Sequence, residues 1–332
     1  METEAMLLLT RGEVTSLLGL AECIDAVEEA FRLHAEGLSL PPGVLETLTA
    51  DGGFHIKSAG LKLAGGSYYA AKVNGNFPLN GERFGLPTIQ GVVLLFDAGR
   101  GRPLAVMDSM ELTALRTAAA TGVAAKYLAR PESKVATVCG CGVQGRVQLR
   151  ALAQVLRIEK VYAFDSEDGR AEIFAREMSA ELGVEVEAAP NLQNAVGESD
   201  VCVTCTPSRR PVLMRGDVRP GTFVAAVGAD NPRKQELDSG LMASGKIVVD
   251  ILEQCAAIGD LHHALEAGAV TRDDVYAELG EIITGRKPGR TSEEEVIIFD
   301  STGTALQDVA VAAVVYERAL RAGRGVKLNL AG

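Results

Sequence analysis

Three glycines with the spacing of a dinucleotide turn lie near the middle of the chain, at Gly140, Gly142 and Gly145. The apolar run Val135–Cys139 precedes them, and a helical pattern follows them. A second apolar run ends on Asp165, about 20 residues past the last glycine. This order brings backbone N–H groups and a helix N-terminus to a pyrophosphate and an acid to the ribose hydroxyls. It predicts a dinucleotide site; the alternative is a glycine turn that packs a helix on a sheet without a ligand.

Lys72 and Arg116 are cations in apolar surroundings. Lys72 follows an apolar, strand-like run beside a turn, in YYAAKVNGNFP, where a lysine can hold a substrate carboxylate. The alternative is a solvated or ion-paired lysine. Arg116 lies in the Ala-rich stretch LTALRTAAATG, which is suited to burial, and a buried guanidinium needs an anionic partner. It therefore forms either an ion pair within the fold or a clamp on a phosphate or carboxylate.

Polar groups also follow two later apolar runs. Asp230 stands in VGADNPRKQEL, just past the end of a strand-like run. Open α/β sheets bind their ligands at the carboxyl edge of the strands, so Asp230 is a candidate general acid or base. The alternative is a turn or helix-capping residue. Ser301 and Thr302 follow the run IIFD, where they either meet a cofactor or cap the final helix.

The composition indicates a soluble globular protein. The chain has 332 residues, enough for two domains, with 47% apolar and 23% charged residues. A net charge of -11 without a basic cluster argues against nucleic acid as a partner and favours small metabolites. No apolar run reaches the roughly 18 residues of a membrane span, and the opening METEAML carries acids where a signal peptide has basic residues. We therefore expect no membrane partner and a cytoplasmic location.

The cysteines allow two interpretations. The pairs Cys139-x-Cys141 and Cys202-x-x-Cys205 could be zinc ligands on neighbouring strands. However, alternate residues of a strand face opposite sides, and zinc pairs of the second kind usually lie on turns. Small buried thiols in a reducing compartment are the better interpretation. With only four histidines in the chain, we expect no metal site.

The arrangement of predicted elements indicates two domains. Residues 44–106 contain short β-like runs separated by turn residues, which predicts a mostly antiparallel sheet with its own domain. After Asp165, strand and helix patterns alternate, which predicts a parallel sheet covered on both faces. Asp273–Thr284 and Thr304–Arg321 have helical patterns. The expected fold class is α/β, with a Rossmann doubly wound parallel sheet plus a second α+β domain.

The chain resembles the ornithine cyclodeaminase/mu-crystallin family and, within it, the archaeal type of alanine dehydrogenase. The matching segments span roughly residues 80 to 320; they are GLPTIQGVVLLFD, PLAVMDSMELTALRTAAATGVAAKYLAR, CGCGVQGRVQL, VGADNPRKQELD, AELGEIITGRKPGR and IFDSTGTALQDVAVA. The resemblance implies a homodimer that uses NAD. It also implies an NAD-binding Rossmann domain over residues 116–304 and a discontinuous substrate and dimerisation domain over residues 1–115 and 305–332.

The resemblance also assigns roles to individual residues. It places the substrate-carboxylate lysine at Lys72, the catalytic aspartate at Asp230 and a substrate contact at Thr302. It places cofactor contacts at Thr88, Arg116, Val143, Gln144, Asp165, Thr206, Lys234 and Ser301. The glycines of the turn, Gly140, Gly142 and Gly145, and also Val227 are further predicted cofactor-binding residues. One segment departs from the family pattern, because FHIKSAG has His55 where an arginine is common and Lys57 where a methionine is common. Both are candidate substrate-binding residues, but neither offers the bidentate fork of arginine.

The expected function is that of an NAD(H)-dependent oxidoreductase that interconverts a small L-amino acid and its imine or 2-oxo acid. Reactions of the alanine dehydrogenase type and of the cyclic ketimine or pyrroline-2-carboxylate reductase type both fit. The alternatives are an ornithine cyclodeaminase, which forms L-proline and ammonia with bound NAD, and a non-enzymatic ligand-binding protein that depends on a nucleotide.

Overall fold

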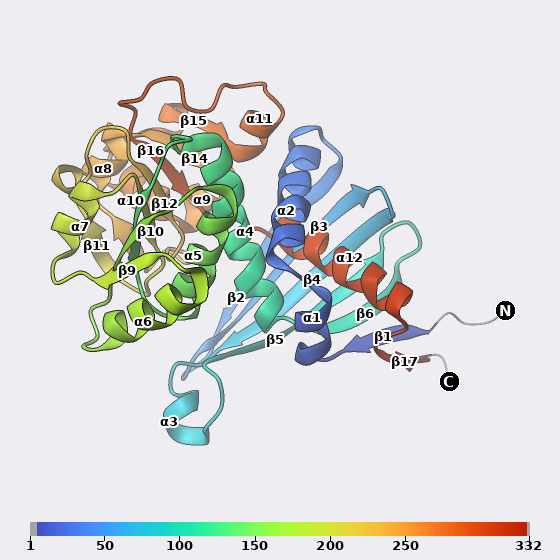
Figure 1. The fold of residues 1–332 in the computed structure, drawn as a ribbon. Helices are drawn as coiled ribbons and strands as arrows, with labels where there is room; N and C mark the ends of the chain where they lie inside the picture. Colours follow the sequence, from blue (N-terminus) through green and yellow to red (C-terminus); the bar gives the residue numbers. More distant parts are fainter. Residues whose placement is uncertain (1–4, 331–332) are drawn as a thin grey trace. The chain divides into compact units, whose positions relative to one another are not determined.

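Two large sheets organise the chain, and each has its own helices (Figure 1). The structure is a computed structural model, and it describes residues 5–330. The chain divides into two compact units. The first unit consists of the chain up to Arg116 together with the chain from Thr304 onward, and the second unit is Thr117–Gly303.

The first unit is built on a seven-stranded sheet in the order β17-β1-β6-β5-β4-β3-β2. Its strands are β1 (Met6–Leu9), β2 (Ser39–Leu48), β3 (Gly53–Leu63), β4 (Gly66–Asn76), β5 (Ile89–Asp97), β6 (Arg102–Asp108) and β17 (Val326–Leu328). Neighbouring strands are antiparallel except for the parallel pair β1 and β6. The predicted, mostly antiparallel sheet is therefore confirmed.

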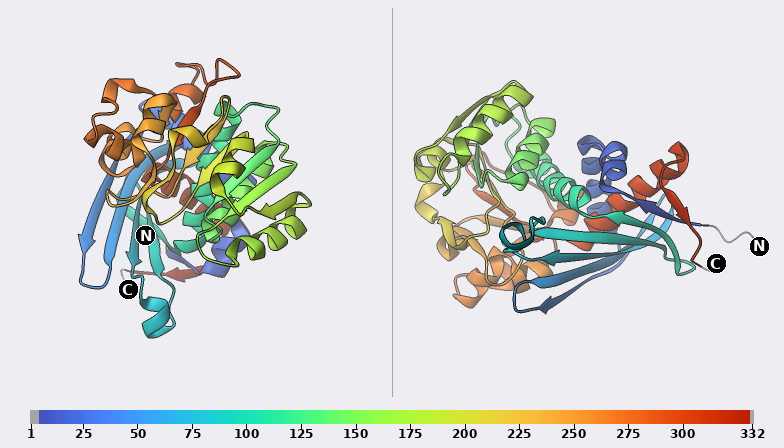
Figure 2. Two further views of the ribbon diagram at one scale, coloured as in Figure 1. Left: turned by 90° about the vertical axis from the view of Figure 1, so that its left-hand side faces the viewer. Right: turned by 90° about the horizontal axis from the view of Figure 1, so that it is seen from below.

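Helices of the first unit cover one face of this sheet (Figure 2). They are α1 (Arg11–Leu17), α2 (Leu20–Ala35) and α12 (Ala305–Ala322). α3 (Asn80–Phe84) lies in the connection between β4 and β5, and the first residues of α4 (Met110–Leu128) also belong to this unit. The apolar side of α2 is buried through residues such as Val27 and Phe31, and α2 packs beside α12. α12 in turn lies on β3, β4 and β5, so side chains that project from this face of the sheet are shielded from water.

The second unit is built on an eight-stranded sheet in which every pair of neighbours is parallel. Its strands are β7 (Val135–Cys139), β8 (Lys160–Phe164), β9 (Glu185–Ala188), β10 (Val201–Thr204), β12 (Phe223–Ala226), β14 (Lys246–Val249), β15 (Val275–Glu278) and β16 (Ile297–Asp300). The order is β15-β14-β16-β12-β10-β7-β8-β9. After β7 the chain adds β8 and β9 on one side of it and then continues with β10 on the other side, so the strand order reverses between β7 and β10. Doubly wound sheets bind ligands beyond the strand ends at such a switch point. The predicted parallel sheet is confirmed.

Helices flank the sheet of the second unit. They are α5 (Val143–Val155), α6 (Arg170–Leu182), α7 (Leu192–Glu198), α8 (Ser239–Ser244), α9 (Leu252–Ile258), α10 (Asp260–Glu266) and α11 (Leu279–Ile283). A small two-stranded pair, β11 (Arg209–Leu213) and β13 (Gln235–Leu237), lies beside them. Apolar side chains of α7 to α10 and of the strands form one buried core, which includes Val224, Met242 and Ile298.

The predicted helix over Asp273–Thr284 is wrong. A 3-10 turn at Arg272–Asp274 leads into the edge strand β15, and only the following five residues form α11. Val275 pairs with Ile247 of β14, so the valine and tyrosine of this segment extend the sheet. Pairing with an existing strand outweighs a weak helical pattern. Among residues 5–330, no helix is long and apolar enough to cross a membrane.

Candidate functional site

The glycine turn of the second unit connects β7 to α5. Gly140 has a φ of 105°, which favours glycine, and a Cβ on Gly145 would lie 2.1 Å from the carbonyl oxygen of Gly140. Gly142 caps α5 without a side-chain hydrogen bond, and no acidic residue lies in the first turn of that helix. The turn therefore packs closely against the helix while the first N–H groups of α5 stay available for an anion.

Asp165, at the end of β8, connects the glycine turn to the next loop. Its Oδ2 accepts a hydrogen bond of 2.8 Å from the N–H of Cys141, and its Oδ1 accepts one of 2.9 Å from the N–H of Glu167. A cavity of about 400 Å³ opens beside it, at the ends of β7, β8 and β10. Its lining residues are Cys139, Gly140, Gly142, Phe164, Asp165, Ser166, Glu167, Arg170, Cys205, Thr206, Pro207, Ser208 and Val212. Four residues predicted to bind the cofactor thus share one cavity.

Glu236 is a buried residue beside this cavity, and it was not among the predicted site residues. Its carboxylate accepts hydrogen bonds from the N–H and the hydroxyl of Thr206 at 2.6 and 2.7 Å. It also accepts from the hydroxyl of Thr204 at 2.8 Å and from the N–H of Gly228 at 2.7 Å. Burial raises the pKa of Glu236, although these four donors oppose the change. Glu236 therefore fixes Thr206 at the mouth of the cavity. No local pattern in the sequence marks Glu236.

Asp230 lies on the loop that follows β12, and its side chain is about half exposed. Its Oδ1 accepts a hydrogen bond of 2.7 Å from Nζ of Lys234. The backbone of Lys234 is held in turn, because its carbonyl oxygen accepts a 2.8 Å hydrogen bond from Nε2 of His263. The expected general base and an expected cofactor residue are thus joined as an ion pair on one loop.

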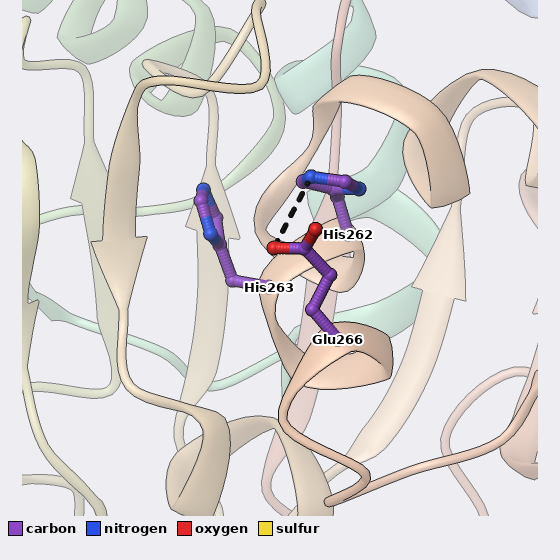
Figure 3. Close-up of side chains that lie close together, drawn as sticks. All are labelled: His262, His263 and Glu266. Atoms are coloured by element: carbon purple, nitrogen blue, oxygen red, sulfur yellow. Dashed lines mark ion pairs between the residues drawn. The ribbon is translucent and has the colours of Figure 1, made fainter.

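His263 belongs to the one group of potential metal ligands in residues 5–330, together with His262 and Glu266 (Figure 3). One ligand atom from each lies within 4.8 Å of the others. His262 faces Glu266, with Nε2 and the carboxylate 3.5 Å apart, whereas His263 points to the other side and binds the carbonyl of Lys234. The arrangement fits an ion pair and a loop support better than a closed metal centre, in which ligand bonds of about 2.1 Å converge on one point.

The turn after β16 carries Ser301 and Thr302 and is held by the buried Asp250. Asp250 accepts hydrogen bonds from both hydroxyls, at 3.3 and 3.2 Å, and from the N–H of Gly303 at 2.8 Å. Gln254 donates a further hydrogen bond of 2.7 Å to Thr302. These contacts fix the conformation of the turn.

Lys72 lies in the first unit, on the face of the sheet that α12 covers, and it is only 3% exposed. Its Nζ donates a 2.9 Å hydrogen bond to Oδ1 of Asp308 on α12. Nε of Arg116 lies 3.0 Å from the same oxygen, and another nitrogen of Arg116 donates to Gln307. The second oxygen, Oδ2 of Asp308, accepts no hydrogen bond from the described part of the chain. Lys72 and Arg116 thus share one buried carboxylate.

The charges of this cluster change its pKa values. Burial lowers the pKa of Lys72 to about 7, and repulsion from Arg116 and Lys57 acts in the same direction, while Asp308 opposes both. Burial would raise the pKa of Asp308, but the positive charges of Lys72 and Arg116 outweigh it, so that this pKa lies below its usual value. Asp308 is therefore a permanent anion, and Lys72 gains or loses its proton near neutral pH.

Lys57 and His55 lie on β3, on the same face of the sheet as Lys72. Lys57 is the direct partner of Lys72 in the β3–β4 ladder, and His55 lies two residues earlier. Nε2 of His55 lies 3.6 Å from a carboxylate oxygen of Glu46 on β2. The structure thus brings together the three predicted substrate-binding residues of this unit. Asp308 was not predicted, because nothing near it in the sequence indicates its pairing with Lys72.

Other predicted residues lie at element boundaries. Val143 and Gln144 begin α5, and Val227 directly follows β12. Thr88 is an exposed residue in the loop before β5. The six cysteines are free thiols, and five of them are buried.

One family model matches most of the chain. It describes the ornithine cyclodeaminase/mu-crystallin family and matches residues 4–323. The alanine dehydrogenase of Archaeoglobus fulgidus is 44% identical over 325 residues, which cover 97% of this chain and 98% of the relative.

Two solved structures are similar over almost their whole length. An archaeal alanine dehydrogenase dimer with bound NAD has a TM-score of 0.93 at 43% identity and covers 98% of this chain and 99% of its own. The Δ1-pyrroline-2-carboxylate reductase of Thermococcus litoralis, in complex with NADH and L-proline, has a TM-score of 0.91 at 36% identity. It covers 97% of this chain and 99% of its own.

Proposed function

Because the chain belongs to the ornithine cyclodeaminase/mu-crystallin family, we propose that it is an NAD(H)-dependent oxidoreductase that interconverts a small L-amino acid and its imine or 2-oxo acid. The observation that carries this proposal is the glycine turn at the switch point of a parallel sheet, with Asp165 bonded to the N–H of Cys141. A dinucleotide site requires a helix N-terminus that can bind the pyrophosphate and an acid that can accept hydrogen bonds from the adenosine ribose.

The residues of the second unit fit a bound NAD. Gly142 leaves open space where a Cβ would stand, since no other atom lies within 4 Å of that position. The N–H groups at the start of α5 would hold the pyrophosphate, and Asp165 would accept hydrogen bonds from the adenosine ribose. Thr206, fixed by Glu236, lines the same cavity. The bound nicotinamide supplies the acceptor or donor of the hydride at the α-carbon of the substrate.

Lys72 and Asp230 have the two chemical roles that the reaction requires of the protein. Lys72 would bind the α-carboxylate of the substrate, with Asp308 keeping part of its positive charge at neutral pH. Asp230 would take a proton from the amine, or from the water that attacks the imine, and return it in the reverse direction. Arg116 and Lys234 are proposed cofactor contacts, with Thr88, Val143, Gln144, Val227 and Ser301, and Thr302 is a proposed substrate contact.

We further propose a homodimer that forms through the first unit. The sheet face opposite α12 carries an apolar row that crosses four strands through Leu45, Ile56, Val73 and Val92. Leu45 is 58% exposed and Val92 is 39% exposed. An exposed apolar sheet face of this kind is typical of a protein interface. The first unit would then be the substrate and dimerisation domain, and Thr117–Gly303 the cofactor domain.

Six free cysteines fit the reducing cytoplasm.

The absorbance of NADH near 340 nm tests the proposed reaction. The purified protein is given NADH with pyruvate and ammonia, or with a cyclic imino acid such as pyrroline-2-carboxylate, and consumption of NADH is expected with at least one of them. Incubation with L-ornithine and NAD, followed by proline analysis, tests the cyclodeaminase reaction, which consumes no NADH. Tight binding of NADH without any turnover across a broad panel of amino and imino acids would contradict an enzymatic role.

A further inference from the structure

The loop between β12 and β13 carries two residues of the proposed site. It consists of residues 227–234 and contains Asp230 and Lys234, which are joined by a 2.7 Å ion pair. Asp230, Pro232 and Arg233 are exposed, so packing against the core does little to position the middle of this loop. Its conformation therefore depends on the groups that hold its two ends.

A single buried carboxylate joins both ends of the loop. Glu236, the second residue of β13, is fully buried. Its Oε2 accepts a 2.7 Å hydrogen bond from the N–H of Gly228, near the start of the loop. A Cβ on Gly228 would lie 2.5 Å from the carboxyl carbon of Glu236, so glycine is required for this close approach. Glu236 thus fixes the start of the loop to its end.

The second oxygen of the same carboxylate holds a different segment. Oε1 of Glu236 accepts hydrogen bonds from the N–H and the hydroxyl of Thr206, at 2.6 and 2.7 Å. Thr206 follows β10 and lines the proposed cofactor cavity. Oε1 therefore holds the loop after β10, whereas Oε2 holds the loop after β12. An ionised carboxylate can hold both because each of its oxygens accepts, whereas an amide has only one acceptor oxygen.

The backbone of Glu236 is itself fixed. Its N–H donates a 2.7 Å hydrogen bond to Oδ1 of the buried Asp260, and the N–H of Leu237 donates to the same oxygen at 2.9 Å. β13 also pairs with β11 on either side of Glu236. Because the carboxylate starts from a fixed backbone, it holds the two loops at a constant spacing.

We propose that Glu236 is a positioning residue that sets the distance between the bound cofactor and the proposed general base, Asp230. It acts through Thr206 on the cofactor side and through Gly228 at the base of the loop that carries Asp230, and it takes no proton in the reaction. The inference rests on the proposed function, because it explains how Asp230 is placed for that reaction. Loss of the carboxylate is then expected to slow turnover even when cofactor and substrate are both saturating.

Glu236→Gln and Glu295→Gln form a matched pair of variants. Glu236→Gln keeps the size of the side chain, but its NH₂ group then meets a backbone N–H of one of the two loops. Glu295 is the control, because its carboxylate also accepts the N–H and the hydroxyl of a threonine, Thr291, at 2.8 and 2.7 Å, outside the lining of the cavity.

The measurements on this pair are Tm and kcat at saturating cofactor and substrate. We expect kcat to fall about tenfold or more in Glu236→Gln and to stay within about twofold of the wild type in Glu295→Gln, even when both variants have a lower Tm. Wild-type kcat in Glu236→Gln overturns the inference. An equal loss of kcat in both variants also overturns it, because the role of Glu236 is then structural alone.

Hydrogen exchange tests the coupling of the two loops without any turnover. Thr206→Val removes a hydroxyl donor from Oε1, keeps the buried carboxylate and changes no residue of the β12–β13 loop, so it provides the test if Glu236→Gln does not fold. We expect amides of residues 227–235 to exchange about threefold or more faster in this variant. The control is Thr137→Val, which removes a buried hydroxyl that lies 2.7 Å from the hydroxyl of Ser199, and it should leave exchange in this loop unchanged.

This measurement also separates the inference from the proposed reaction. Faster exchange in Thr206→Val alone supports the coupling through Glu236 even when the wild type turns over no amino or imino acid, and the proposed reaction then fails alone. Unchanged exchange in Thr206→Val, in a protein whose wild type oxidises or reduces a substrate of the panel, leaves the reaction standing and overturns the inference.

Discussion

Lys57 of β3 and Lys72 of β4 are direct partners in an antiparallel ladder, and both side chains are buried. Like charges at opposite positions of a ladder destabilise the sheet, so this pair carries a cost in folding free energy. Asp308 offsets part of the cost through its 2.9 Å bond to Lys72. Burial, and then repulsion from Arg116 and Lys57, lowers the pKa of Lys72 to about 7, so that its charge depends on pH near neutrality.

We expect the affinity for a carboxylate to fall as the pH rises above 7. Lys72 must carry its proton to attract the anion, and burial, together with Arg116 and Lys57, lowers its pKa to about 7. Above that pH the free protein has lost the proton, so each further pH unit weakens binding by up to about tenfold. The measurement is the Kd of succinate and of propionate with NAD present, by calorimetry at pH 6, 7, 8 and 9.

Asp308→Asn provides the control for this titration. Asp308 is the group that holds the proton on Lys72, so its removal is expected to move the loss of affinity to lower pH. It also leaves two buried cations without their shared anion and is expected to lower Tm. A wild-type Kd that is constant from pH 6 to pH 9 for both ligands shows that Lys72 does not govern carboxylate binding.

Asp165 is expected to make NADH the preferred cofactor over NADPH. Its carboxylate is fixed by the N–H groups of Cys141 and Glu167 at the edge of the cavity, where a 2′-phosphate would meet a like charge. The Kd of NADPH, measured by fluorescence titration, is expected to exceed that of NADH by about tenfold or more. Asp165→Asn is expected to lower the ratio of the NADPH Kd to the NADH Kd. The control Glu167→Gln, at an exposed position, is expected to change this ratio less. Tighter binding of NADPH by the wild type would contradict the prediction.

Local sequence patterns predicted the parts of the site that lie close together in the chain. The glycine turn and Asp165 form one βαβ unit, so spacing alone was sufficient to place them. Lys72 and Asp308 are 236 positions apart, and only the packing of α12 on the first sheet brings them together. Glu236 shows the same limit, because its four donors belong to Thr204, Thr206 and Gly228, which lie at the ends of β10 and β12. The strand at Val275–Glu278 was missed for a related reason, since an edge strand depends on its neighbour.

Asp260→Asn is expected to raise Tm at pH 8. Asp260 is fully buried, and its Oδ1 accepts hydrogen bonds from the N–H groups of Glu236 and Leu237, whereas Oδ2 accepts none from the described residues. Burial, and then the charge of Glu236, raise the pKa of Asp260 from 3.8 to about 7. Between these values the folded protein holds a proton that the unfolded chain has released, so stability falls as the pH rises through this window. Asparagine keeps the acceptor without the charge.

Thermal unfolding from pH 5 to pH 8 measures this effect. The Tm of Asp260→Asn is expected to exceed that of the wild type by a few degrees at pH 8, and the difference should shrink toward pH 5. Asp273→Asn, at an exposed position, is the control and should follow the wild type at every pH. A Tm of Asp260→Asn that is lower than the wild type at pH 8 would mean that the ionised carboxylate stabilises the fold.

Asp230→Asn is expected to keep cofactor affinity while losing turnover. The change preserves the shape of the side chain and removes the group that takes a proton in the proposed reaction. Loss of a general base typically lowers the rate by roughly 10²–10⁴-fold. The measurements are the Kd of NADH and kcat with the best substrate of the panel.

The ion pair between Asp230 and Lys234 offers a competing explanation that the same experiment separates. If Asp230 only holds Lys234, then Asp230→Asn weakens NADH binding, because Lys234 is a proposed cofactor contact, and kcat at saturating NADH stays close to the wild-type value. A general base gives the opposite pattern, with unchanged Kd and low kcat. Asn231→Ala is the control, since it changes the neighbouring side chain and leaves the carboxylate and the 2.7 Å bond to Lys234 in place. Wild-type kcat in Asp230→Asn would therefore assign the proton transfer to another group.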